Sequence, residues 1–180
     1  MRYTENDRGF FSQPAEKLGP QLLGKTLCRR LLDGQVLRLK IVDVEAYGAN
    51  DTANYGFGYE GNGGSKRKTK TNAPLFEQGG ISCIYANMLL IVCGEKGQPD
   101  NILIRGGADQ NNRYDGPIKV ARALQIDSDA AFKKVDLLTS DALWIEDDDR
   151  MGPVCRTVRH GLGNSVNKED KEIRARFITI

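Results

Sequence analysis

Two strand-like runs joined by Asp33-Gly34 constrain the fold of this chain more than any other feature. The first run covers residues 26–32 and the second covers residues 36–44. An Asp-Gly dipeptide between two such runs is a strong signal for a two-residue β-hairpin loop. The sequence therefore predicts an antiparallel pair of strands in the first quarter of the chain.

The remaining periodic segments are mostly short strands. We expect further strands at residues 81–85, 88–93, 102–104, 143–146, 154–158 and 173–178. We expect helices over residues 14–23, from Gly116-Pro117 through Leu124, and around residues 128–134, with a kink or a break at Pro20. Strands and helices do not alternate regularly, which favours an α+β fold over a doubly wound sheet.

The length of 180 residues predicts a single domain, residues 1–180, with one core. No apolar run reaches about 18 residues, so we expect no membrane span. The N-terminal residues are charged and do not resemble a signal peptide, which predicts a nuclear or cytoplasmic protein. The net charge of only +2 means that any DNA-binding surface must be local.

The cysteines and the histidine do not form a metal-binding pattern. Cys28, Cys83, Cys93 and Cys155 are widely spaced without a C-x-x-C pair, and His160 is the single histidine. We therefore expect no zinc site and four reduced thiols in the core.

Residues 48–74 form a long segment rich in Gly, Asn, Lys and Thr, with little hydrophobic periodicity. A stretch of this length inside a compact domain is usually a functional loop or a disordered one. Lys66, Arg67, Lys68 and Lys70 form a basic cluster within it. Such a cluster is either a solvated face or a DNA contact.

Glu45 is the first candidate for chemistry. Apolar residues occupy the odd positions from 37 to 41, so odd positions should face the core. The same parity places Asp43 and Glu45 on the core side, unless a bulge reverses it. A carboxylate at a strand end before a long loop is a candidate general base, and an ion pair with an arginine is the alternative.

Short motifs along the chain resemble those of the alkyladenine (3-methyladenine) DNA glycosylase family, from about residue 10 to residue 178. Residues 41–47, Ile-Val-Asp-Val-Glu-Ala-Tyr, resemble the family's I-V-E-T-E-A-Y block. The other matching segments, in chain order, are Phe10-Phe11-x-x-Pro14, Leu22-Leu23-Gly24, Asp51-x-Ala53, Thr69-x-x-Asn72-x-x-x-Phe76, Leu103-Ile104-Arg105, Gly116-Pro117-x-Lys119, Asp136-Leu137, Trp144-Ile145-Glu146, Arg159-x-Gly161 and Arg176-Phe177. Their order and near-family spacing make the resemblance specific.

The resemblance implies a single α+β domain with a curved antiparallel sheet flanked by helices. It implies a monofunctional DNA glycosylase that flips alkylated or deaminated purines out of duplex DNA and hydrolyses the N-glycosidic bond. No cofactor and no metal are expected. The expected partner is double-stranded DNA that contains a damaged purine, bound by a monomer without any membrane.

The resemblance also implies roles for individual residues. Glu45 activates the water that attacks the sugar, and Arg105 joins it, either by anchoring the Glu45 region or by contacting phosphate. Lys119 has the same two alternatives. Tyr47 and Tyr85 fall on base-stacking positions, for which the alternative is core packing.

Several positions depart from the family pattern. Tyr55 falls where the family has a pocket histidine, so it can wall the pocket but cannot make the same hydrogen bonds. The hairpin after Tyr85 is two residues shorter and lacks the family's wedge tyrosine. Met88 or Asn87 takes that place, unless Met88 packs in the core.

Two further departures concern selectivity and DNA contacts. The family asparagine that helps to exclude normal guanine falls near Cys93. The family's R-N pair is Thr71-Asn72, so Asn72 is kept as a DNA contact and the basic loop replaces the lost arginine. These departures leave two alternatives to an active glycosylase, a DNA- or lesion-binding homologue with weak or no catalysis and an RNA-associated module.

Overall fold

The computed structural model describes residues 1–59, 64–147 and 152–180. In this part of the chain, ten strands form one antiparallel sheet with the order β7-β3-β4-β5-β2-β1-β8, while β6 pairs with β5 and β10 joins β2 to β9. The strands are β1 (Thr26–Arg30), β2 (Val36–Tyr47), β3 (Ile81–Tyr85), β4 (Met88–Val92), β5 (Asn101–Ala108), β6 (Arg113–Asp115), β7 (Val135–Asp136), β8 (Leu143–Glu146), β9 (Val154–Thr157) and β10 (Arg176–Thr179). The expected α+β class with an antiparallel sheet is confirmed.

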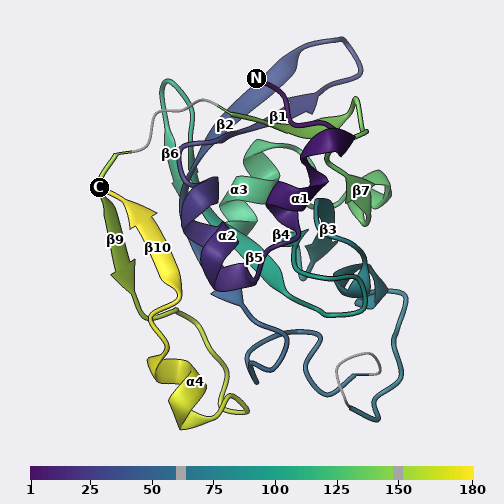
Figure 1. Ribbon diagram of the computed structural model, residues 1–180. Coiled ribbons are helices and arrows are strands. Elements are labelled where there is room, and N and C mark those ends of the chain that lie inside the picture. Colours follow the sequence, from purple (N-terminus) through teal and green to yellow (C-terminus); the bar gives the residue numbers. More distant parts are fainter. Residues whose placement is uncertain (60–63, 148–151) are drawn as a thin grey trace.

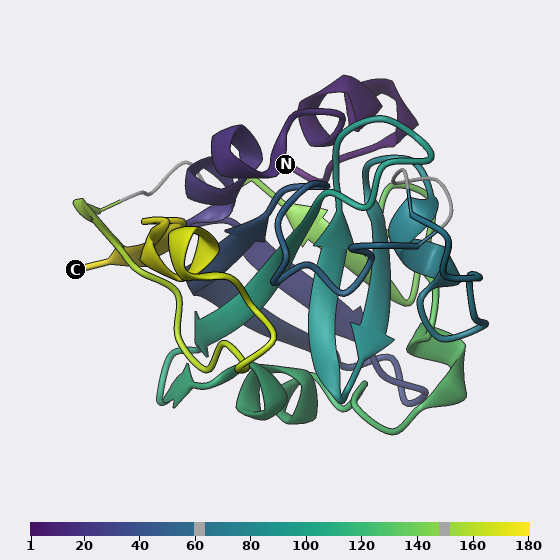
Figure 2. The ribbon, with the colours of Figure 1, turned by 90° about the horizontal axis from the view of Figure 1, so that it is seen from below.

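Short helices pack against this sheet. The α-helices are α1 (Arg8–Phe11), α2 (Ala15–Leu22), α3 (Pro117–Ala123) and α4 (Lys168–Glu172), and the 3-10 helices are η1 (Glu5–Asp7), η2 (Ala73–Phe76) and η3 (Ala130–Phe132). Helix α2 contacts β2 and β5, and α3 contacts β5, β4 and β6. In Figure 2 the purple α1 and α2 lie above the strands and the green α3 lies below them. None of the helices in the described residues combines the length and the apolar character that a membrane crossing requires.

The predicted hairpin is present, but its loop has three residues instead of two. The backbone N–H of Leu31 donates to Gln35 O, and that of Gly34 donates to Leu31 O. Gly34 adopts a φ of 87°, which glycine reaches without a steric penalty. A turn followed by a left-handed residue is the common three-residue hairpin loop.

Strand β2, with 12 residues, is the longest strand in the described part of the chain, and it lies between β5 and β1 in the sheet (Figure 1). Its first half pairs with β1, its second half pairs with β10, and β5 lies along its other edge. The register to β5 shifts between Ile41 and Asp43 and again between Asp43 and Val44. The shifts compensate, because Ile41 pairs with Gly107 before them and Val44 pairs with Ile104 after them.

These register shifts overturn the prediction that Asp43 and Glu45 lie on the core side. Ile41 belongs to the main hydrophobic core, but after the shifts it is Val44 and Ala46 that continue this core. Tyr47 belongs to a second, smaller cluster with residues of β3, β4, β5 and η2. The irregularity therefore turns the odd positions, including Glu45, to the opposite face.

Other expectations need smaller corrections. Helix α2 continues through Pro20, so the predicted break into two pieces is wrong. The helix expected around residues 128–134 is a single 3-10 turn, and the strand expected at 173–178 begins only at Arg176. Cys28, Cys83 and Cys93 are buried as free thiols, but Cys155 is exposed, so the expectation of four core thiols is wrong for Cys155. Burial raises the pKa of the Cys83 thiol to about 12.

Candidate active site

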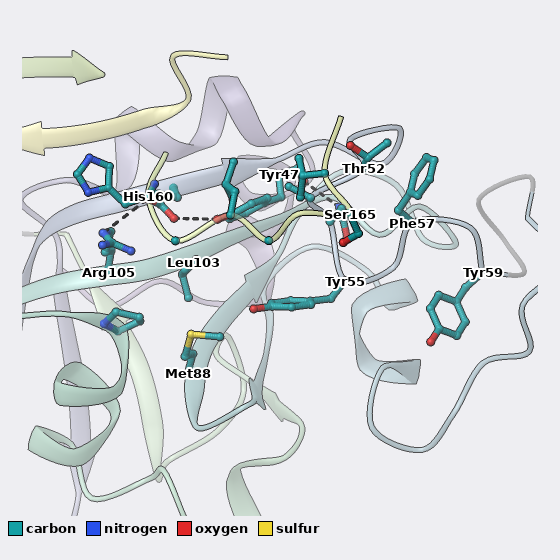
Figure 3. Close-up of a pocket in the computed structure, with 18 of the residues that line it drawn as sticks. Tyr47, Thr52, Tyr55, Phe57, Tyr59, Met88, Leu103, Arg105, His160 and Ser165 are labelled. Atoms are coloured by element: carbon teal, nitrogen blue, oxygen red, sulfur yellow. Dashed lines mark hydrogen bonds and ion pairs between the residues drawn. The ribbon is translucent and has the colours of Figure 1, made fainter. Parts of the chain in front are cut away.

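A pocket of about 660 Å³ opens where the second half of β2 meets the loop that follows it (Figure 3). Strands β2, β4 and β5 supply its base, and residues of the 52–59 loop form part of its wall. The segment from His160 to Val166, which precedes α4, covers another side. Sequence-distant segments meet at this point, since the 52–59 loop is hydrogen-bonded to the start of α4.

Glu45 contributes a carboxylate to the pocket wall. Its Oε2 accepts a hydrogen bond from the Tyr47 hydroxyl at 2.8 Å, and its Oε1 accepts one from the backbone N–H of His160 at 2.8 Å. The residue is 0% exposed although it lines the pocket, because these neighbours and Arg105 cover it. A carboxylate can accept about four hydrogen bonds, so Glu45 can still accept a hydrogen bond from a further donor such as water.

Arg105 lies on β5 beside two carboxylates. Its Nε is 3.5 Å from Glu45 Oε1 and 3.9 Å from Asp43 Oδ2. Asp43 is also held by Arg176, whose Nε and Nη2 donate to its two oxygens at 3.1 and 2.7 Å. The hydrogen bond to Asp43 raises the pKa of Arg176. Two arginines thus face two buried carboxylates, an arrangement that offsets the cost of burying the anions.

Tyr47 is buried between the pocket and a positive charge. The guanidinium of Arg159 lies 4.6 Å from the centre of its ring. Burial raises the pKa of the Tyr47 hydroxyl, and the nearby Glu45 raises it further. The hydroxyl therefore remains a neutral donor to Glu45.

Tyr55 lies on the 52–59 loop and forms the other aromatic wall of the pocket. Figure 3 shows its ring below that of Tyr47, with Leu103 and Met88 beside the space between them. Tyr55 stacks on Tyr85 at a centroid distance of 4.3 Å and an interplanar angle of 28°. Tyr85 supports Tyr55 from behind and is outside the set of pocket-lining residues. Burial, with smaller effects of Tyr85 and Glu45, raises the pKa of Tyr55.

The β3–β4 hairpin ends beside the same pocket. Ala86 and Asn87 form its exposed tip, with φ values of 49° and 60°. Met88, half-buried, faces the pocket at the start of β4. Cys93, near which the family resemblance predicts an asparagine, belongs to the main core on the other face of the sheet.

The predicted DNA contacts are distributed around the pocket. Lys66 lines the pocket, 5.6 Å from the Tyr59 ring centre, and the Lys68 amine lies 4.2 Å from the Phe76 ring centre. Arg67, Lys70 and, on α3, Lys119 are exposed. Asn72 is only 2% exposed, and its Oδ1 accepts hydrogen bonds from the N–H and the hydroxyl of Thr69. Its side chain stabilises the loop from inside and does not reach the surface.

Residues 159–166 contribute a donor and a cation to the site that were not expected from the sequence. His160 supplies the backbone donor to Glu45, and Arg159 supplies the cation behind Tyr47. The signal that could have located them was the Arg159-x-Gly161 motif, which carried no role. The structure also brings in Tyr59 and Leu162, which lie in or beside the smaller hydrophobic cluster.

The chemistry that this arrangement permits is base catalysis beside an aromatic slot. Within the described ranges, no group of three or more His, Cys, Asp or Glu side chains is placed to hold a metal ion. An oriented carboxylate next to an arginine can accept a proton from water and stabilise developing positive charge. Tyr47 and Tyr55 present ring faces on which a planar base can stack.

Comparison with known proteins gives a consistent result. The model of the family described as methylpurine-DNA glycosylase matches residues 9–179. A candidate 3-methyladenine DNA glycosylase from Borreliella afzelii is 33% identical over 153 residues, which cover 78% of this chain and 77% of the relative. Another from Clostridium botulinum is 30% identical over an alignment of 185 positions, and the alignment covers 87% of each chain.

Proposed function

Because this chain belongs to the methylpurine-DNA glycosylase family, we propose that it flips alkylated or deaminated purines out of duplex DNA and excises them with a water activated by Glu45. The protein is a DNA glycosylase, a hydrolase of N-glycosyl bonds that acts in DNA repair. The names of its relatives indicate 3-methyladenine as a substrate. The lesion range, the flipping step and the role of Glu45 are the parts that we propose.

The observation that carries this proposal is the environment of the Glu45 carboxylate. It lies in the wall of a pocket with tyrosine rings on two sides, and two donors fix its orientation at 2.8 Å each. The geometry therefore supports an aligned carboxylate base at the place where a flipped nucleotide would enter.

The reaction follows from this placement. Glu45 accepts a proton from water while the water oxygen attacks C1′ of the damaged nucleotide. The bond between C1′ and the purine nitrogen breaks, and its electron pair leaves with the base. A cationic alkylated purine departs as a neutral molecule, which makes it a good leaving group. The carboxylate also stabilises the positive charge that develops on the sugar.

Binding of the damaged base would use the aromatic walls. Stacking on an aromatic face contributes roughly 1–3 kcal/mol per base. A cationic purine gains further from attraction to the electron-rich faces of Tyr47 and Tyr55. Met88 beside the slot supplies apolar contact where the base leaves the helix, and Lys66, Arg67, Lys68, Lys70 and Lys119 supply contacts to the phosphates.

The decisive experiment measures methylpurine release from alkylated duplex DNA by the wild-type protein and by Glu45→Gln. The substitution keeps the shape but removes the base, so single-turnover release should fall at least about 100-fold. Glu146→Gln on β8 is the matched control, because Glu146 pairs with Arg38 and lies outside the pocket. Release by Glu45→Gln at the wild-type rate would rule out the proposed mechanism.

A second candidate function is lesion binding without excision. The β3–β4 hairpin favours it, since its tip carries Ala86 and Asn87 and no tyrosine that could fill the space left by a flipped base. In that case the wild-type protein would bind lesion-containing duplexes with a strong salt dependence and release no base. The same assay, run with a gel-shift measurement, separates the two functions.

A further inference from the structure

Arg159 has a buried guanidinium in the middle of the site. The side chain is 0% exposed and follows β9, just before the segment that covers the pocket. Its Nη1 donates to the backbone oxygen of Ala46 at 3.0 Å and is paired with the carboxylate of Asp51. Its Nη2 donates to the backbone oxygen of Asp170 at 2.7 Å. One side chain thus joins the end of β2, the loop after it and helix α4.

Each of these contacts bears on a different part of the pocket. The guanidinium carbon of Arg159 lies 4.6 Å from the centre of the Tyr47 ring, and the next residue, His160, donates its backbone N–H to Glu45. Asp51, which Arg159 holds, also accepts from the N–H of Ala53, two residues before Tyr55. The base, one aromatic wall and the start of the loop that carries the other wall all depend on the same guanidinium.

We propose that Arg159 is a positioning residue for base excision, which holds Glu45 and the two tyrosine walls in one geometry. This inference rests on the proposed function. Arg159 acts through other residues: it places the His160 N–H against Glu45, and it fixes the ring of Tyr47 from the side opposite the slot. Preorganised donors and rigid walls lower the reorganisation that the reaction would otherwise require.

Arginine is suited to this task and lysine is not. The guanidinium is a rigid fork that donates in several directions at once and stacks flat on an aromatic ring. A lysine ammonium keeps the charge next to Asp51, but it cannot also reach Ala46, Asp170 and the face of Tyr47. Arg159→Lys therefore separates positioning from charge balance, because the buried Asp51 retains a cation.

The test compares Arg159→Lys and Arg159→Met with the wild-type protein in single-turnover methylpurine release at increasing protein concentration. Both variants should release base roughly 10- to 100-fold more slowly at saturation, the effect of one charge-assisted hydrogen bond. The maximal rate should fall by a larger factor than the half-saturating protein concentration rises. This split follows because contacts to the phosphates supply much of the DNA affinity, and Arg159 is not among the residues that line the pocket.

The matched control is Arg29→Met. Arg29 is also a buried arginine, with its guanidinium 4.3 Å from the Phe132 ring centre, and it lies outside the pocket. Its loss should lower the thermal midpoint without lowering the maximal release rate. Arg159→Lys decides the question if Arg159→Met does not fold.

The outcomes are distinguishable. A folded Arg159→Lys variant with the wild-type maximal release rate would overturn the positioning role. A maximal rate that falls equally in Arg29→Met would also overturn it, because the fall would then reflect general loosening of the fold. A wild-type protein that releases no methylpurine would instead overturn the proposed function.

Discussion

At the scale of single residues, the site depends on the pairing of Glu45 with Tyr47. Residues two apart on a strand share a face, so the phenol reaches back to the carboxylate. Burial prevents either group from exchanging its partner for bulk water, which makes the hydrogen bond worth more than one at the surface. The proposed base and the proposed first stacking wall are therefore one structural unit.

Tyr47→Phe tests this unit. Removing the hydroxyl leaves the buried carboxylate with one donor fewer, which should lower the free energy of unfolding by about 1–3 kcal/mol. Chemical denaturation should show a lower midpoint with an unchanged slope. Tyr114→Phe is the control, since its hydroxyl donates to Asp109 at the surface and should matter much less. Equal effects of the two substitutions would contradict the prediction.

The sequence predicted the pocket residues better than their connections. Four residues that the sequence placed in the site do line one pocket: Glu45, Tyr47, Tyr55 and Arg105. They could be predicted because each lies in, or aligns with, a recognisable motif. Arg159 and His160 were given no role, although the Arg159-x-Gly161 motif matched, since their roles arise from a buried guanidinium and a backbone N–H that a motif does not specify. Asn72 is expected from its motif to contact DNA, but its side chain is buried, and the motif carries no information about burial.

At the scale of elements, the β3–β4 hairpin has an unfavourable residue at its tip. Positive φ at both central positions is typical of a type I′ turn, where Asn, Asp and Gly are preferred over Ala. The hairpin keeps Ala86 there, although a left-handed conformation costs such a residue roughly 1–2 kcal/mol.

Ala86→Asn should therefore stabilise the protein by roughly 0.5–1 kcal/mol and raise the thermal midpoint by about 1–4 °C. Asn87→Ala, one position along, should have the opposite effect. Differential scanning calorimetry measures both changes. A lower midpoint for Ala86→Asn would show that the tip is constrained by something other than its own backbone.

Gly106 on β5 tests the irregular part of the sheet. A Cβ at this position would lie 2.8 Å from the Cβ of Asp43, so one of the two strands must move. Gly106→Ala should lower stability by about 1–3 kcal/mol and slow base release, because Asp43 organises Arg105 and Arg176. Gly9→Ala, where nothing lies within 4 Å, is the control for the exchange itself. A wild-type release rate in Gly106→Ala would show that this arrangement is not needed.

Most strand positions followed from the apolar runs, and the irregularities did not. The runs at 81–85 and 143–146 match β3 and β8 residue for residue. The short β6 and β7 were missed, because two or three residues carry no periodicity. The register shifts in β2 were missed because alternation alone assumes an unbroken strand.

At the scale of the whole molecule, a small net charge must coexist with DNA binding. The protein carries only +2, so its affinity for phosphates has to come from local groups. We propose that four exposed cations contact the phosphates. These are Lys66 at the pocket, Arg67 and Lys70 on the same loop, and Lys119 on α3.

A triple substitution of Lys66, Lys68 and Lys70 to Ala should therefore weaken binding and flatten its salt dependence. Each lost phosphate contact reduces the slope of log K against log salt by about 0.9. A control that replaces the exposed Lys17, Lys133 and Lys168 gives the same net charge, from +2 to −1 after the loss of three positive charges. Equal slopes in the two triple variants would remove the basic loop from the DNA-binding surface.

The paired register shifts in β2 have a consequence for the sheet as a whole. Because the second shift cancels the first, β5 is aligned with β2 in the same way before and after the irregular stretch. The disturbance is confined to a few residues and does not propagate to the outer strands. The Glu45 side chain faces the pocket and not the main hydrophobic core, while β5 keeps its alignment with β2 on both sides of the irregular stretch. In this way, a sheet with an otherwise ordinary hydrophobic pattern can carry a buried carboxylate that lines a pocket.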